Sequence, residues 1–174
     1  RAGRPLHEMR REDKLRRVHW VPLAKISPEL LDFVVAIEDR RFRMHKGIDF
    51  RALGGAVRDY TLHGGRRSAR TISMKTAALL KGGRMTGKFR EALGAIHLER
   101  EWTKDEILES YLNLVSFRGD LVGVEAASRG LFHKDPHALT SLEAAILGTL
   151  LRDPEANVET VVRRACAAHD AYPL

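Results

Sequence analysis

A glutamate at the end of an apolar segment is the residue best placed to do chemistry. Glu38 follows the apolar run 30–37, and Ser27 with Pro28 opens that run as a predicted helix. On such a helix Glu38 lies one turn after Val34, at the end of the face that packs in the core. Burying a carboxylate there is costly unless the group is paired. Glu38 is therefore either half of a structural ion pair or a general acid or base.

A second glutamate, Glu91, lies within a helix predicted over residues 88–102. Its spacing places it with Ala95 and Leu98 on a largely apolar stripe of that helix. An ion pair with Lys88, three residues earlier, is the structural alternative to a catalytic role.

A basic segment, residues 66–75, follows two glycines and combines hydroxyl groups with cations. Loop amides and cations at a helix start can hold a phosphate; a solvated basic loop is the alternative. Ser73 and Lys75 resemble a hydroxyl–amine nucleophile pair only loosely, because side chains two residues apart on a helix point in different directions.

The elements that must position these groups are almost all helical. Strand-like alternation is nearly absent, so the expected fold class is all-α. Capping boxes at Thr103–Glu106 and Thr140–Glu143 mark two helix starts. Residues 117–120 read as a turn, and Asn113 as a helix-end residue that makes local hydrogen bonds. The helices are predicted over residues 28–37, 50–62, 76–80, 88–102, 104–115, 121–132, 144–151 and 158–169.

Length and composition favour one compact domain with an anionic partner. The chain has 174 residues, 44% hydrophobic, and a formal charge of +7. The lone Cys166 excludes an internal disulfide and a cysteine metal cluster. No signal peptide is visible, and no apolar run approaches the roughly 20 residues that span a bilayer. Because the chain begins at Arg1, we expect an excised domain whose membrane anchor lies outside it.

Five stretches of the chain form an ordered set of motifs: 38–49, 68–75, 88–91, 104–113 and 123–145. Together they resemble one family, the peptidoglycan glycosyltransferases. These are the glycan-polymerising domains of class A penicillin-binding proteins and the monofunctional transglycosylases. Residues 1–6, 20–23 and 117–121 are most similar to the penicillin-binding protein 1C branch.

The resemblance implies a lysozyme-like helical domain over residues 27–174, preceded by a basic arm, residues 1–26. Separately from the resemblance, the glycines at 64–65 and 82–83 suggest a small mobile flap over the cleft, residues 64–85. The implied location is the outer, periplasmic face of the cytoplasmic membrane. The implied partners are lipid II, the growing glycan strand, that membrane surface, a C-terminal transpeptidase domain and other cell-wall synthesis proteins. No recognition helix or aromatic stacking pattern supports a nucleic-acid partner.

By the same resemblance, Glu38 is the general base for an inverting transfer to the 4-hydroxyl of the acceptor sugar. Glu91 would assist the departing diphosphate, directly or through a divalent cation such as Mg²⁺ or Mn²⁺, with no other cofactor required. The residues expected to contact substrate are Asp39, Phe42, His45, Arg70, Thr71, Ser73, Lys75 and Lys88.

The second family signature is altered in this chain. Arg70 stands where the family has a small serine, and Lys75 where it has a glutamine. Ala78 and Gly87 stand where the family often has basic residues. Either the lost positive charge is supplied from shifted positions, or the site has lost catalysis and the domain only binds lipid II as a scaffold. We expect retained activity; a lysozyme-like hydrolase is a further alternative.

Overall fold

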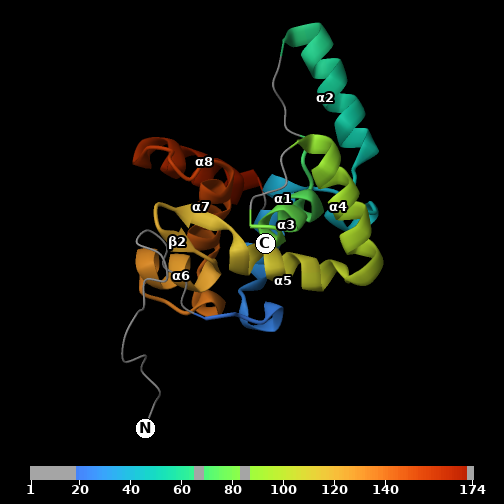
Figure 1. Ribbon diagram of the computed structural model, residues 1–174. Helices are drawn as coiled ribbons and strands as arrows, with labels where there is room; N and C mark the ends of the chain where they lie inside the picture. The colour runs from blue at the N-terminus through green and yellow to red at the C-terminus, as the bar shows by residue number, and fades with distance from the viewer. Residues whose placement is uncertain (1–18, 65–68, 83–86, 172–174) are drawn as a thin grey trace. The chain divides into compact units, whose positions relative to one another are not determined.

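The computed structural model describes residues 19–64, 69–82 and 87–171 (Figure 1). These residues form eight α-helices and one short antiparallel hairpin, which agrees with the predicted all-α, lysozyme-like class. In chain order the elements are η1 (Leu23–Lys25), α1 (Pro28–Glu38), η2 (Phe42–Met44), α2 (Phe50–His63), α3 (Ile72–Leu80), α4 (Lys88–Glu101), α5 (Lys104–Leu114), β1 (Ser116–Arg118), β2 (Leu121–Val122), α6 (Val124–Phe132), η3 (Pro136–Ala138), α7 (Ser141–Arg152) and α8 (Val158–Ala171).

The helix starts follow the predicted caps. The backbone N–H of Leu30 donates to Ser27 Oγ at 3.1 Å at the start of α1. Thr140 and Glu143 form the predicted reciprocal capping box of α7. Thr103 likewise exchanges hydrogen bonds with Glu106 before α5. These local contacts satisfy orphan amides, which is why they could be predicted without the tertiary structure.

The chain divides into two compact units. One comprises residues 1–37 with 112–174, and the other residues 38–111. The chain therefore passes between the units at the end of α1 and within α5. The predicted domain, residues 27–174, contributes to both units.

In the first unit, α7 packs along α8, and the hairpin lies on α6 and α7. The predicted turn at 117–120 is this hairpin, so the helix predicted from residue 121 begins at Val124 instead. Gly123 explains the difference, because it has a φ of +87° and a Cβ there would lie 2.8 Å from the carbonyl oxygen of Asn113. Only glycine allows this approach, and the helix starts immediately after it.

Asn113 makes a long-range contact rather than the predicted local one. Its buried amide accepts from the N–H of Val21 at 2.8 Å and donates to the carbonyl of Val21 at 2.9 Å. Val21 and Ile26 are both buried in this unit. Residues 19–26 of the predicted basic arm thus belong to the packed structure, and residues 1–18 of that arm lie outside the described residues.

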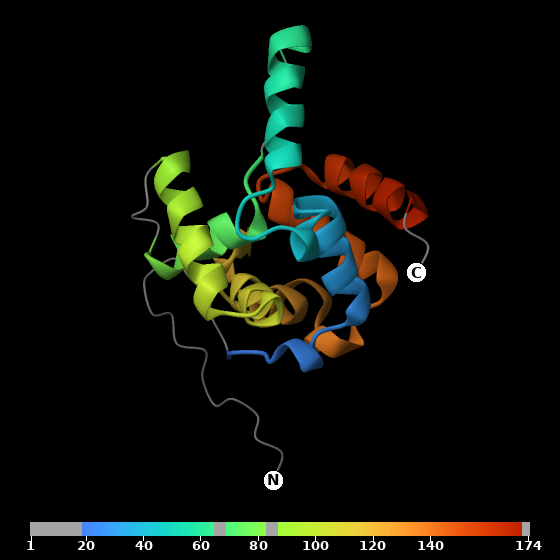
Figure 2. The same cartoon turned by 90° about the vertical axis from the view of Figure 1, so that its right-hand side faces the viewer.

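In the second unit, α3 and α4 pack on each other and α2 projects away from them (Figures 1 and 2). Asp49 caps α2 through the N–H groups of Arg51 and Ala52, and Gly64 ends it with a φ of +65°. One face of α2 is apolar and exposed; it consists of Phe50, Leu53, Val57 and Tyr60. Among the described helices, none is long and apolar enough to cross a bilayer.

Helix α3 begins at Ile72, four residues earlier than predicted. Thr71 caps it, because its Oγ1 accepts from the N–H of Met74 at 3.2 Å. Most of α3 is buried, so the middle of the predicted flap, residues 64–85, is a packed helix. The glycine-bearing turns that motivated the flap fall largely on residues 65–68 and 83–86, which lie outside the described residues, so its mobility stays a prediction.

Candidate functional site

Glu38, the last residue of α1, has a nearly buried side chain that is only 3% exposed. Its Oε2 forms an ion pair with the ammonium of Lys75 on α3. Its other oxygen, Oε1, is buried and accepts no hydrogen bond from any residue in the described part of the chain. Glu38 is therefore paired on one side and has an unsatisfied acceptor on the other, as a base that takes a proton from a substrate requires.

The Lys75 ammonium lies between Glu38 and an aromatic wall. Its Nζ is 6.0 Å from the centre of the Tyr111 ring. Burial raises the pKa of the Tyr111 phenol, and the opposing positive charge of Arg70 does not offset that effect. Tyr111 therefore stays protonated, and its uncharged side chain lines the site next to Lys75.

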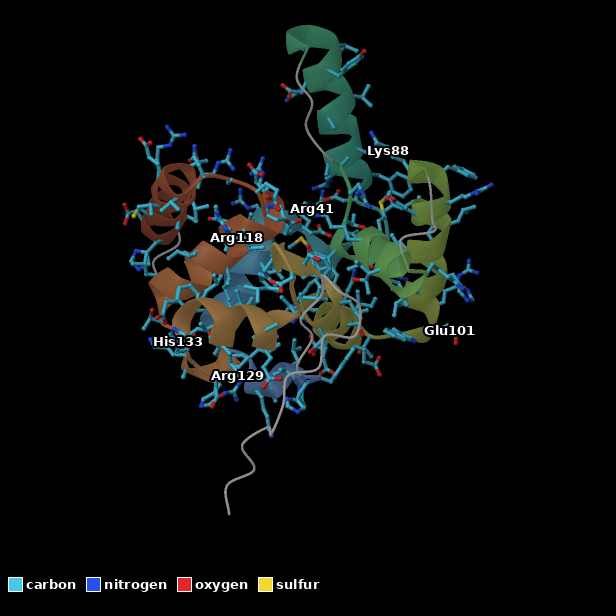
Figure 3. The ribbon with its side chains drawn as sticks, turned by 60° about the vertical axis from the view of Figure 1, so that its left-hand side comes forward. Arg41, Lys88, Glu101, Arg118, Arg129 and His133 are labelled. Atoms are coloured by element: carbon cyan, nitrogen blue, oxygen red, sulfur yellow. The ribbon has the colours of Figure 1, made fainter. Side chains whose placement is uncertain are left out.

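Glu91, in the first turn of α4, pairs with Arg70 rather than with Lys88. Its Oε2 lies 2.8 Å from Arg70 Nε, and its Oε1 accepts from Arg70 Nη2 at 3.0 Å. The local ion pair proposed from the sequence is thus replaced by one that spans 21 residues. Lys88 is exposed at the first position of α4, and Glu101 marks the other end of that helix (Figure 3).

The site therefore holds two acid–cation pairs within one unit, residues 38–111. Both cations come from one short segment, because Arg70 directly precedes the cap of α3 and Lys75 follows in its first two turns. These two residues are the cations that stand at altered positions of the second signature. Each departure has placed a positive charge on one of the two candidate catalytic carboxylates.

Beneath these pairs, a buried hydrogen-bond network joins the 38–49 stretch to the start of α3. The Asp39 carboxylate lies 2.9 and 3.1 Å from His45 Nε2 and accepts from the N–H of Ile72 at 3.0 Å. Thr71 Oγ1 donates to the carbonyl of Gly47 at 2.6 Å. Gly47 has a φ of +88°, and a Cβ there would meet the α4 backbone at 2.9 Å. Glycine is thus required for both the turn and the close packing.

A third carboxylate, Glu99 on α4, belongs to this network and was missed by the sequence reasoning. Its Oε1 contacts Ser73 Oγ and accepts from Lys104 Nζ at 2.7 Å. The same oxygen lies 3.9 Å from His45 Nδ1. Glu99 is eight residues after Glu91 and so on nearly the same helical face, which is the signal that could have identified it.

Most of the expected substrate-contacting residues have buried, structural contacts. Phe42 is fully buried under Lys104, whose Nζ lies 4.4 Å from the ring centre. The other buried members of this set are Asp39, His45, Thr71 and Ser73. Their positions indicate that they orient the 38–49 stretch and α3. Arg70, Lys75 and Lys88 are the predicted contacts with exposed surface, and direct contact with substrate stays a prediction for all eight.

The donor set around Glu91 does not fit a divalent cation. Both of its oxygens are in contact with the Arg70 guanidinium. Across the described ranges, no group of three His, Cys, Asp or Glu side chains is arranged to hold a metal ion. Mg²⁺ and Mn²⁺ prefer several oxygen ligands, so a bare metal site would need Arg70 to be displaced.

A match to a family model and matches to individual proteins both indicate the same family. The family model described as "Transglycosylase" matches residues 2–171. The chain is 42% identical over 139 residues to a biosynthetic peptidoglycan transglycosylase of Shewanella denitrificans, covering 78% of this chain and 61% of that protein. It is 44% identical over 139 residues to the protein of the same name from Rhodospirillum centenum, covering 78% and 60%.

A longer relative also matches. The chain is 37% identical over 140 residues to penicillin-binding protein 2D of Bacillus subtilis, covering 78% of this chain but 20% of that protein. The chain thus spans about three fifths of the length of the transglycosylases that it matches.

Proposed function

We propose, since this chain belongs to the transglycosylase family, that it is a peptidoglycan glycosyltransferase that polymerises lipid II into glycan strands. The observation that carries the proposal is the Glu38 side chain, which is buried and paired through one oxygen while the other accepts no hydrogen bond from the described residues. A hydroxyl group donating to that oxygen would complete its hydrogen bonding.

In the proposed step, Glu38 Oε1 takes the proton from the 4-hydroxyl of the acceptor sugar. The oxygen attacks the anomeric carbon of the donor strand, and a new glycosidic bond forms. The bond from that carbon to the lipid diphosphate breaks, and its electron pair leaves on the phosphate oxygen. A single displacement of this kind inverts the anomeric configuration. Until the proton is transferred, the ion pair with Lys75 holds the Glu38 carboxylate in one orientation.

The departing undecaprenyl diphosphate is proposed to lie at the start of α4. Arg70 and Lys88 bring positive charge there, and Lys88 occupies the first helical position. The N-terminus of a helix of this length also favours an anion. These groups would stabilise the negative charge that develops on the leaving oxygen.

The second candidate is a lipid-II-binding scaffold domain that has lost catalysis. The observation in its favour is that both glutamates are paired with cations from altered positions, Arg70 and Lys75. The deciding experiment is incubation of the chain with labelled lipid II, with product size read on a gel. Glycan strands support the enzyme; retention of lipid II on the protein without any polymer supports the scaffold. Release of soluble fragments from finished cell wall would instead indicate a hydrolase.

We also propose that the chain works at the outer face of the cytoplasmic membrane, with α2 in contact with the lipid surface. The exposed apolar face of α2 and the net charge of +7 both support contact with an anionic bilayer. The finer placement in the penicillin-binding protein 1C branch, with a transpeptidase domain beyond residue 174, is likewise a proposal, supported by residues 117–121.

A paired substitution on α2 tests the membrane contact. Leu53→Asp with Val57→Asp should reduce sedimentation with phosphatidylglycerol-containing vesicles by about tenfold or more, because each apolar side chain contributes roughly 1.5–3 kcal/mol when buried. The matched control is Val158→Asp with Val162→Asp on α8, where the side chains are similarly exposed and the charge change is the same. Equal loss of binding in both pairs would contradict a specific role for α2.

A further inference from the structure

The geometry points to a glycosyl transfer that needs no divalent cation: we propose that the Arg70 guanidinium, held by Glu91, is the fixed cation at the leaving diphosphate. The proposal rests on the proposed function and adds to it how the charge of the leaving group is neutralised. It also makes Arg70 a residue that contacts the substrate.

The first support is the geometry of the pair. Arg70 Nε and Nη2 reach different oxygens of Glu91, at 2.8 and 3.0 Å. The hydrogen bond from Nη2 and the close ion-pair contact at Nε together restrict the position of the guanidinium. A fixed cation needs no reorganisation when negative charge develops, which is the condition under which electrostatic stabilisation is largest.

The second support is the difference in exposure between the partners. The Glu91 side chain is 10% exposed, whereas that of Arg70 is 39% exposed. An incoming diphosphate therefore meets the guanidinium before the carboxylate. Glu91 is the anchor that holds the cation, and its own negative charge is screened from the leaving group by its partner.

The third support is the absence of a competing ligand set within the described residues. The other buried carboxylates of the site have structural partners: Asp39 contacts His45 and Ile72, and Glu99 contacts Ser73 and Lys104. A metal ion at Glu91 would have to displace Arg70 and recruit ligands already used in holding the fold together.

The backbone before α4 disfavours a residue with a side chain at position 87. Gly87 is the N-cap of α4 and has a φ of +103°, a conformation that residues with a side chain rarely adopt. A basic residue at that position would strain the start of the helix. Arg70, reaching α4 from the segment before α3, supplies the cation without that strain.

The test measures polymerisation of labelled lipid II by the wild-type chain in excess EDTA, in Mg²⁺ and in Mn²⁺. We expect rates that agree within about twofold in all three conditions. Arg70→Ser should lose about 10²-fold in EDTA, which is the usual effect of removing one transition-state donor. Because this variant uncovers Glu91, Mn²⁺ should restore at least part of the loss.

Two controls separate this effect from general damage. Arg129→Ser removes an equivalent pair on α6, because Arg129 Nε donates to Glu125 at 3.0 Å and the Glu125 side chain is also 10% exposed (Figure 3). This variant should polymerise at the wild-type rate and stay insensitive to EDTA. Arg70→Ser combined with Glu91→Gln should lose the rescue by Mn²⁺.

A measurement of Mn²⁺ binding tests the role of the Arg70–Glu91 pair independently of catalytic activity. Titration with Mn²⁺ in the presence of inorganic pyrophosphate, followed by electron paramagnetic resonance, should show no specific site at Glu91 in the wild type. Arg70→Ser should show one new site, with pyrophosphate oxygens completing the ligand set, and Glu91→Gln should remove it. If EDTA abolishes wild-type polymerisation and Mg²⁺ restores it, or if the wild type binds Mn²⁺ through Glu91, the proposal is overturned. If no polymer forms under any condition, the proposed function fails, and the titration still decides whether Arg70 occupies the place of a metal.

Discussion

Glu38→Gln is expected to lower the rate of lipid II polymerisation by about 10²–10⁴-fold, the range that a positioned general base contributes. The amide has nearly the same shape as the carboxylate but cannot take the proton of the acceptor hydroxyl. Because Oε1 of the native side chain accepts no hydrogen bond from the described residues, it is the oxygen that can accept the proton of the acceptor hydroxyl. The measurement is the initial rate of glycan-strand formation, read from labelled product on a gel.

The fold should survive this change. The glutamine oxygen can still accept a hydrogen bond from Lys75, and the Lys75 side chain is 23% exposed, so water can also solvate it. Circular dichroism and thermal unfolding would confirm that the variant is folded. Glu101→Gln is the matched control, since Glu101 is an exposed glutamate at the far end of α4 and should leave the rate unchanged (Figure 3). Wild-type strand formation by Glu38→Gln would show that the base has been assigned to the wrong residue.

The parts of the fold that sequence reasoning predicted are those decided by local contacts. Ser27, Thr103 and Thr140 satisfy amides three residues away, so cap and helix can be predicted together. Asn113 could not be predicted in this way, because its partner Val21 lies 92 residues earlier in the chain. The hairpin at 116–122 was missed for a related reason, since two strands of three and two residues carry too short a pattern to recognise.

The same distinction between local and long-range contacts applies to the candidate site. The burial of Glu38 and Glu91 follows from helical spacing, and the structure places both on largely buried faces. Their partners, Arg70 and Lys75, lie 21 and 37 positions away in the chain, and no sequence spacing predicts contacts over such separations. Spacing also does not distinguish a polar residue that contacts substrate from one that holds the scaffold. Asp39 illustrates the difficulty, because its carboxylate is fully engaged in joining the 38–49 stretch to α3.

Glu91→Gln is expected to lower kcat by about 10²-fold while changing KM little, because an Arg70 guanidinium that is held less firmly stabilises the departing diphosphate less well. The amide can still accept one hydrogen bond from Arg70 but cannot hold the guanidinium through two oxygens. Little stability should be lost, since Arg70 is 39% exposed and ion pairs of that exposure contribute roughly 0–1 kcal/mol. Steady-state kinetics with labelled lipid II separate kcat from KM.

The double variant Arg70→Ser with Glu91→Gln tests whether the two residues act together or separately. If Glu91 acts through Arg70, removing both should cost little more than removing either one, since residues that share one interaction are not additive. Glu125→Gln, which weakens the equivalent pair with Arg129, should leave both kinetic parameters unchanged. Additive losses would mean that Glu91 and Arg70 act on the substrate separately, and a rise in KM alone would mean that the pair only binds lipid II.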